Sequence, residues 1–394
     1  MTKTIDFEAL RAIGLGEAMR RQLDPGVADP RLRPMRVIEV QRAEWRLHDG
    51  RAVHRAVCLP ALARELAAGD DALAVGDWVL ACADGGDGAD GTPGAGGCTI
   101  TCRLLPHCRI TRRTSDGGRS GDQRGRAQRQ VLVSNVDTAL LVMGLDHDFQ
   151  LRRLERYLAL AQLSGVRAVL VLSKADTVAP ERVALCLAQV ADLLPQRLPT
   201  LALDLRCDQA ASALAPWLRP GQTLVLLGSS GAGKSTLANT LVRACRAAAN
   251  GGAAQATGAV RADDSRGRHT TTARSLLALP GGACIIDTPG LRALRLDVAD
   301  ADQLADAFGD VARYAPLCRF RDCHHQQEPG CAVRDAVPEP RLLNYQKLLR
   351  EAGRDSQTVL ERRAQLAQWK ARGRAGQARA RAKRVGGSDG EAVD

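Results

Sequence analysis

The order of two nucleotide-binding motifs constrains this chain more than any other feature. A glycine-rich phosphate loop, GSSGAGKST, spans residues 228–236, and SKAD, a motif of the type that reads a guanine base, lies upstream at residues 173–176. Each motif follows a short apolar run, as expected of a buried strand in a parallel sheet. The sequence therefore predicts an α/β nucleotide-binding domain whose base-reading half comes first.

The phosphate loop fits the pattern GxxxxGK[ST]. Its backbone amides and the N-terminus of the following helix can close on phosphate oxygens, Lys234 can reach the terminal phosphates, and Ser235 can ligate magnesium. A nucleoside triphosphate with Mg²⁺ is the expected ligand. The residues expected to line it are Gly228, Ser229, Ser230, Gly231, Ala232, Gly233, Lys234, Ser235 and Thr236.

SKAD is a weaker pattern when taken alone. The Asp176 carboxylate can accept both the ring and the exocyclic N–H groups of guanine, a pair that adenine lacks, and the stem of Lys174 can lie along the base plane. Ser173 stands where this motif usually has Asn, a change expected to weaken guanine affinity.

A third motif, DTPG at residues 287–290, also follows an apolar run. Asp287 is expected to hold the magnesium ion, and the Gly290 amide is expected to contact the terminal phosphate. Between the phosphate loop and DTPG lies GRHTTT, residues 267–272, in the position of a switch loop. Phosphate loop, switch and DTPG thus keep the order of a GTPase, while the base-reading motif is displaced to the front.

Hydrolysis needs a group that orients the attacking water, often a Gln directly after DxxG. Leu291 occupies that position here and cannot form a hydrogen bond through its side chain. His269, two residues before Thr271 in the presumed switch, is the polar candidate, and a solvated loop histidine is the alternative. Slow hydrolysis that a partner accelerates is the expectation.

A cysteine-rich segment, CRFRDCHHQQEPGC, begins at residue 318. Three thiolates and one imidazole within it provide the ligands of a closed, structural zinc site. His324 competes with its neighbour for the imidazole position. Disulfides are the alternative, but no signal peptide or transmembrane run is evident, so a reducing cytosol is expected. The candidate ligands are Cys318, Cys323, His325 and Cys331.

Together these motifs resemble the RsgA (YjeQ) family of GTPases that depend on the small ribosomal subunit. The resemblance runs from about Arg36 to the basic tail and includes GDWV at 76–79, SNVD at 134–137 and LERYL at 154–158. It implies a circularly permuted GTPase domain with an N-terminal OB barrel and a C-terminal zinc domain. It further implies Thr271 as the switch threonine and magnesium ligand, His269 as the hydrolytic histidine, and His325 over His324 as the zinc ligand. The second base-contacting motif of that family has no clear match in LALDLRCD, residues 201–208.

Charge and length support the same class of protein. The chain has 394 residues and a formal net charge of +11, concentrated in residues 109–130 and 362–384. Two such basic segments suit a phosphate-backbone contact, and 3% aromatic residues argue against base stacking as the main contact. We expect a cytoplasmic monomer that binds the small ribosomal subunit and its rRNA, with no membrane partner. An ATPase or kinase, or an RNA-binding scaffold with a vestigial nucleotide site, are the alternatives.

The sequence predicts a multidomain protein with five parts. A flexible arm with a short helix at 7–12 is expected over residues 1–33, an all-β OB-fold barrel over 34–129, and an α/β GTPase domain over 130–300. A small helical zinc domain over 301–355 and a basic tail over 356–394 complete it. Cys98 and Cys102 are expected to share one face of a barrel strand as core thiols. The cofactors expected are GTP as substrate, Mg²⁺ and one structural Zn²⁺.

Overall fold

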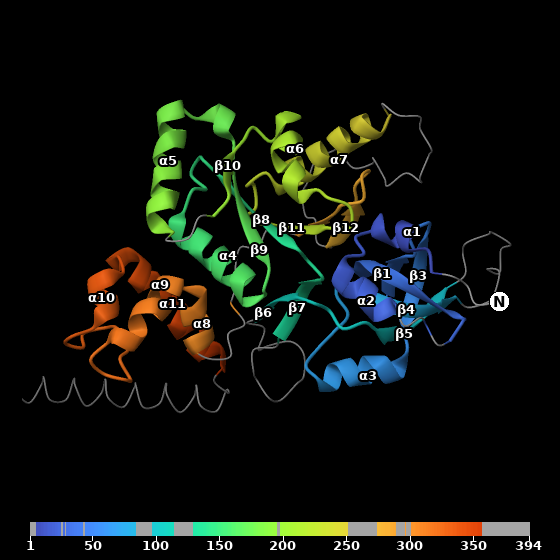
Figure 1. The fold of residues 1–394 in the computed structure, drawn as a ribbon, viewed down its shortest axis with the longest axis horizontal. Helices are drawn as coiled ribbons and strands as arrows, with labels where there is room; N and C mark the ends of the chain where they lie inside the picture. The colour runs from blue at the N-terminus through green and yellow to red at the C-terminus, as the bar shows by residue number, and fades with distance from the viewer. Residues whose placement is uncertain are drawn as a thin grey trace, which may run out of the picture.

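The structure is a computed structural model that describes residues 5–24, 27, 29–41, 44–83, 97–113, 129–194, 198–250, 274–288, 296 and 301–356. These residues form a β-barrel, an α/β domain and a group of helices that follow one another along the chain (Figure 1). His269, Thr271, Gly290, Leu291, most of the basic segment 109–130 and the whole basic segment 362–384 lie outside the described residues.

Five strands close the barrel. β1 is long enough to pair with β2 through its second half and with β4 through its first half, and β5 pairs with both β3 and β4. Helix α3 (Pro60–Ala68) follows β3. The ring β1-β2-β3-β5-β4 confirms the predicted OB-like barrel. Its strands are β1 (Leu32–Gln41), β2 (Glu44–His48), β3 (Val53–Cys58), β4 (Trp78–Ala83) and β5 (Cys98–Arg103).

One barrel expectation is wrong. Cys98 is buried, but Cys102 is exposed. The pairing of β4 with β5 shifts register between Leu80 and Ala81, whose partners are Cys102 and Ile100. Because side chains alternate along a strand, this irregularity moves Cys102 off the core face.

The expectation of a mobile N-terminal arm also needs correction. Helices α1 (Phe7–Arg11) and α2 (Glu17–Leu23) both form, and their apolar side chains pack around the fully buried Trp78 of the barrel. Asp6 caps α1 by accepting a hydrogen bond from the Ala9 amide at 3.1 Å. Burial of this apolar surface gives the arm a fixed place that its sequence alone did not reveal.

The α/β domain contains the parallel strands that the sequence predicts. The sheet order β10-β9-β8-β11-β13 is parallel throughout, and β12 is added antiparallel to β13. The rotated motif order is visible in it, because the strand that ends in SKAD precedes the strand that ends in the phosphate loop. The strands are β8 (Thr138–Gly144), β9 (Arg167–Ser173), β10 (Thr200–Ala202), β11 (Thr223–Gly228), β12 (Ser275–Ala278) and β13 (Cys284–Asp287).

Helices cover both faces of this sheet. Alternate residues of the central strands enter two separate buried clusters, so that Leu141 and Met143 of β8 face one layer while Leu140 and Val142 face the other. The first layer contains α4 (Leu151–Leu163) and α5 (Pro180–Leu193), and the second contains α6 (Gln209–Leu214) and α7 (Lys234–Asn250).

The barrel is attached to the α/β sheet through main-chain pairing. Strand β1 pairs with β12 at Glu39 and Ser275, so the two sheets form one continuous set of hydrogen-bonded strands. A separate hairpin of β6 (Arg109–Arg113) and β7 (Arg129–Ser134) connects the barrel to β8 along the chain. The buried guanidinium of Arg36 on β1 links the barrel to two other segments: it donates to the carbonyl oxygen of Ile13, between α1 and α2, at 2.6 Å and to that of Asn135, between β7 and β8, at 3.2 Å.

The C-terminal helices pack against α4. Their buried side chains, among them Phe308, Val311 and Tyr345, belong to the same cluster as Leu154 and Tyr157 of α4. These helices are α8 (Ala301–Ala307), α9 (Gly309–Tyr314), α10 (Ala332–Ala336) and α11 (Glu339–Ser356). Figure 1 shows them beside α4, away from the barrel. Within the described part of the chain, no helix has both the length and the apolar character needed to span a membrane.

Candidate nucleotide site and metal cluster

The carboxyl ends of four parallel strands bring the nucleotide motifs together. β9, β8, β11 and β13 are consecutive neighbours in the sheet, and they end in SKAD, the segment 144–149, the phosphate loop and DTPG respectively. The carboxyl edge of an open α/β sheet is where ligands of this fold class bind.

Glycines allow the phosphate loop to take its path. A Cβ on Gly228 would lie 2.3 Å from the carbonyl oxygen of Val142 in the neighbouring strand, so no larger residue fits there. Gly231 and Gly233 have φ angles of +83° and +97°, which favour glycine. Helix α7 begins at Lys234, directly after the loop, and presents its N-terminus to the space that the loop encloses.

The side chain of Lys234 is buried inside the loop. Its ammonium donates to the carbonyl oxygens of Ser229 at 2.7 Å and Gly228 at 3.1 Å. Burial lowers the pKa of Lys234, and the nearby carboxylates of Asp287 and Asp148 oppose that shift. A terminal phosphate would give this cation an anionic partner within reach of the same loop.

Asp287 and Ser235 form a pair of oxygen ligands suited to a divalent cation. The Ser235 hydroxyl lies 3.4 Å from Asp287 Oδ2, and Asp287 Oδ1 is buried with no hydrogen-bond partner among the described residues. Burial raises the pKa of Asp287, and the Lys234 charge opposes it. An orphaned carboxylate oxygen beside a hydroxyl fits Mg²⁺, which prefers hard oxygen ligands. The next residue, Thr288, anchors the motif by donating to the carbonyl oxygen of Leu226 at 2.6 Å.

Ser173 connects the base-reading motif to the phosphate loop. Its buried hydroxyl donates to the carbonyl oxygen of Ala232 at 2.7 Å, so the residue that replaces the usual Asn still joins the two motifs. The next residue, Lys174, has a left-handed φ of +62°, and its ammonium lies 2.7 Å from Asp146. Asp176 forms an ion pair with Arg206.

The segment LALDLRCD, unassigned from sequence, lies beside this motif. It begins with β10, pairs with β9 through the Leu203 amide and the Leu172 carbonyl at 2.9 Å, and places the buried Leu205 against Gly233. Arg206 of this segment reaches both Asp176 and Asp204. Sequence reasoning missed Arg206 as a site residue. The available signal was topological, because a strand parallel to β9 must end at the same edge of the sheet.

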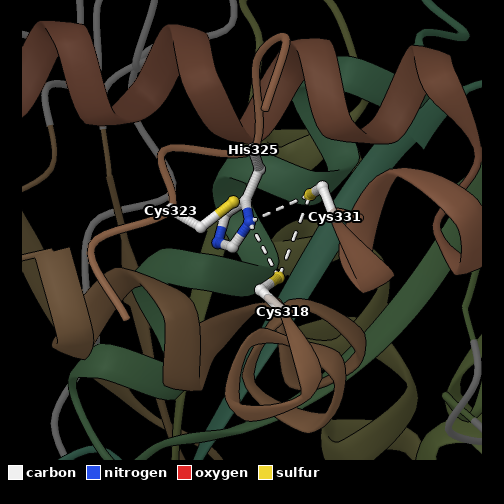
Figure 2. A group of neighbouring side chains, drawn as sticks. All are labelled: Cys318, Cys323, His325 and Cys331. Atoms are coloured by element: carbon white, nitrogen blue, oxygen red, sulfur yellow. Dashed lines mark hydrogen bonds between the residues drawn. The ribbon is translucent and has the colours of Figure 1, made fainter. Parts of the chain in front are cut away.

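The predicted metal ligands converge in the C-terminal unit (Figure 2). The ligand atoms of Cys318, Cys323, His325 and Cys331 all lie within 4.8 Å of one another. Cys318 Sγ lies 3.6 Å from His325 Nδ1 and 3.9 Å from Cys331 Sγ, and Cys331 Sγ lies 3.5 Å from the same nitrogen. Usual Zn–S and Zn–N bond lengths place tetrahedral ligand atoms roughly 3.5–3.8 Å apart. The cluster therefore has the donor set and the spacing to hold a zinc ion, and its cysteines are free thiols.

The local backbone explains which histidine turns inward. His325 has a left-handed φ of +58°, is buried, and its carbonyl oxygen accepts a hydrogen bond from the Gln346 side chain at 2.6 Å. His324 is exposed, and its amide instead donates to the Glu328 carboxylate at 3.1 Å. The structure thus favours His325, the residue that the family resemblance indicates.

Comparison with known proteins identifies the family. The RsgA GTPase family matches residues 91–297, which include SKAD, the phosphate loop and DTPG. The chain belongs to the RsgA GTPase family. It is 41% identical over 345 residues to a protein of Xanthomonas oryzae pv. oryzae, covering 86% of each chain, and 41% identical over 337 residues to one of Xylella fastidiosa, covering 84% of this chain and 91% of the relative. Both relatives are named small ribosomal subunit biogenesis GTPase RsgA.

Solved structures support the fold of this RsgA family member. The crystal structure of YjeQ from Thermotoga maritima aligns with a TM-score of 0.56 at 19% identity, covering 82% of this chain and 98% of that chain. The structure of YloQ, described as a circularly permuted GTPase, aligns with a TM-score of 0.53 at 18% identity, covering 83% and 96%. The fold is thus shared with both proteins over more than four fifths of this chain.

Proposed function

We propose that this protein is a GTPase that binds the small ribosomal subunit and assists or checks its late maturation, with GTP hydrolysis driving its release. One observation carries the proposal above the others. The phosphate loop, the base-reading motif and the DTPG aspartate meet at one sheet edge, within a chain that belongs to the RsgA GTPase family. Membership of this family and the names of its relatives disfavour an ATPase or a kinase.

The described residues would divide the work of binding GTP. The phosphate-loop amides and the α7 N-terminus would bind the phosphates, Lys234 would pair with their charge, and Ser235 with Asp287 would hold Mg²⁺. Magnesium, when bound, would neutralise part of the negative charge of the phosphates. Asp176 would accept the guanine N–H groups after exchanging its pairing with Arg206.

Three further residues complete this proposal. Thr271 would be a third protein ligand of magnesium, Gly290 would contact the terminal phosphate, and His269 would orient the attacking water. Because Leu291 follows DTPG in place of a hydrogen-bonding side chain, slow hydrolysis without a partner is expected. The ribosomal particle would accelerate the reaction by ordering the loop that carries His269. Loss of the γ-phosphate would then weaken the bound state and release the protein.

The remaining parts would serve attachment. The cysteine cluster would hold one structural zinc, and the barrel and the basic segments would contact rRNA through its phosphates. Because these contacts are to phosphates, affinity for the ribosomal particle should fall steeply as salt concentration rises. We further propose a cytoplasmic protein that acts as a monomer.

The decisive experiment measures GTP turnover with and without purified small ribosomal subunits. We expect strong stimulation in the wild type and its loss in His269→Ala, with His107→Ala as a control because that histidine is exposed and lies in the link between barrel and α/β domain. No stimulation of the wild type would refute the ribosomal proposal. Full stimulation of His269→Ala would refute only the role of that histidine. Competition of labelled GTP by unlabelled ATP tests the base preference separately.

A further inference from the structure

The segment between β8 and α4, residues 145–150, belongs to none of the nucleotide motifs. We refer to it as the β8–α4 loop. Strand β8 lies between β9 and β11 in the sheet, so this loop leaves the sheet edge between SKAD and the phosphate loop. Two aspartates in the loop, Asp146 and Asp148, each contact one of these motifs.

Asp148 fixes the β8–α4 loop to the phosphate loop. Its largely buried carboxylate accepts hydrogen bonds from the Ser229 hydroxyl at 2.6 Å and from the Gly144 amide at 3.0 Å, and it forms an ion pair with Arg153 at the start of α4. Three partners on three different segments hold this side chain in one orientation. Asp148 therefore holds this end of the loop in a fixed position.

Asp146, in the same loop, contacts the base-reading motif. Its Oδ2 lies 2.7 Å from Lys174 Nζ, and its Oδ1 accepts a hydrogen bond from the Asp148 amide at 3.1 Å. Burial opposes ionisation of Asp146, but the hydrogen bonds from Lys174 and the Asp148 amide outweigh it and lower its pKa. Asp146 is therefore charged near neutral pH and is fixed by its own neighbour.

The position of Lys174 depends on this contact. Its backbone is left-handed, which is unusual for a lysine, and its four-carbon stem runs from SKAD to Asp146. An unanchored lysine samples many rotamers, and ordering it costs conformational entropy when a ligand binds. The ion pair with Asp146 restricts the stem before the base arrives.

We propose that Asp146 is a positioning residue for guanine recognition, which holds Lys174 so that its stem forms a preset platform for the base. This inference rests on the proposed assignment of SKAD as the base-reading motif. Asp148 supports the platform by tying the β8–α4 loop to the phosphate loop, so that the base and phosphate subsites share one rigid connection. The ligand class is a guanine nucleotide.

The test is a double-mutant cycle in the full-length protein, read by titration with fluorescently labelled GDP and Mg²⁺. Asp146→Asn should weaken GDP binding about three- to tenfold, since a partly exposed charge pair and its preorganisation are lost. Asp192→Asn, an exposed aspartate on α5, is the matched control and should bind as the wild type does. Lys174→Met keeps an apolar stem without the charge, so adding Asp146→Asn to it should change affinity by less than about twofold.

Two outcomes would overturn the proposal. Wild-type affinity in Asp146→Asn would show that the contact does not matter. An equal loss in the Lys174→Met background would show that Asp146 acts by another route. A further variant, Asp176→Asn, tests separately whether SKAD is the base site. Its amide should favour xanthosine diphosphate over GDP if Asp176 reads the base. An unchanged base preference in Asp176→Asn would reject the base site itself.

Discussion

Replacing Arg341 with methionine should weaken the contact between the C-terminal helices and the α/β domain. Arg341 on α11 donates to Glu155 of α4 at 2.7 Å and to Asp310 of α9 at 2.8 Å, and its guanidinium lies 4.9 Å from the centre of the Phe308 ring. The side chains of Arg341 and Glu155 are only 6% and 2% exposed. Methionine keeps an apolar stem against the ring, so the change removes mainly the charge.

The expected cost follows from the group left behind. Removing one partner of a buried ion pair destabilises a protein by about 3–5 kcal/mol, because the remaining charge is uncompensated. Glu155 keeps the hydrogen bond from Asn344 Nδ2 at 2.6 Å, so the lower end applies. We expect the free energy of unfolding to fall by roughly 3 kcal/mol at neutral pH.

The same loss should depend on pH. Burial raises the pKa of Glu155, while Arg341 and Asn344 oppose it, so removing Arg341 raises this pKa further. A carboxyl group with a raised folded-state pKa penalises folding when it is ionised, above that pKa, and the penalty disappears as the pH falls below it. The difference in stability between the variant and the wild type should therefore shrink as the pH is lowered from neutral into the acid range in which Glu155 takes up a proton.

Urea denaturation of the zinc-loaded proteins, followed by circular dichroism, measures these free energies. The control is Arg341→Met combined with Glu155→Gln, which removes one of the two stranded carboxylate charges, leaves Asp310, and should recover part of the stability with a weaker pH dependence. A cost below about 1 kcal/mol for Arg341→Met, or no recovery in the double variant, would refute the reasoning.

Three further predictions concern the nucleotide and metal sites. Asp287→Asn should abolish the Mg²⁺ dependence of GTP binding. In the wild type, Mg²⁺ affinity should fall as the pH drops towards the raised pKa of Asp287, since the metal needs the ionised carboxylate. Equal Mg²⁺ affinities in titrations at two pH values would contradict this. Cys323→Ser should reduce bound zinc, measured by elemental analysis, from one ion per chain to well below one, because it removes a ligand. His324→Ala should keep its zinc. Loss of zinc in His324→Ala but not in Cys323→Ser would contradict this choice of ligands. Asp176→Asn should weaken GDP binding by about 1–3 kcal/mol in calorimetry, because one of the two carboxylate oxygens that accept from guanine N–H groups becomes an NH₂ donor; equal affinity would exclude this carboxylate from base recognition.

The parallel strands were predictable because burial on both faces gives continuous apolar runs. β8 and β11 are buried along their whole length, and the phosphate loop follows β11 directly. β12 was not predicted, since only one of its four residues is buried and its pairing with β1 is non-local. A short run of this kind carries no periodicity that distinguishes a strand from a turn.

Site residues were predictable where they belong to a contiguous motif. Lys234 and the metal cluster follow from spacing, but Arg206 and Asp146 reach the site from segments distant in sequence, and neither lies in a recognisable pattern. The N-terminal helices show the same limit, because Met19 and its neighbours are buried in a cluster that they form with Trp78 of the barrel. Such contacts depend on the tertiary arrangement rather than on local preference.

The pairing of β1 with β12 has a consequence for synthesis. Glu39 and Ser275 are separated by more than 200 residues, which a ribosome takes tens of seconds to add at about 5–20 residues per second. During that time the barrel can close, but the β1 edge that later receives β12 has no partner, and open strand edges promote aggregation. Glu39 carries a charge at this edge and pairs with Arg46 at 3.3 Å, a feature that discourages pairing with other chains. The junction that seats the barrel in the finished protein is therefore among the last edges to be covered as the nascent chain folds.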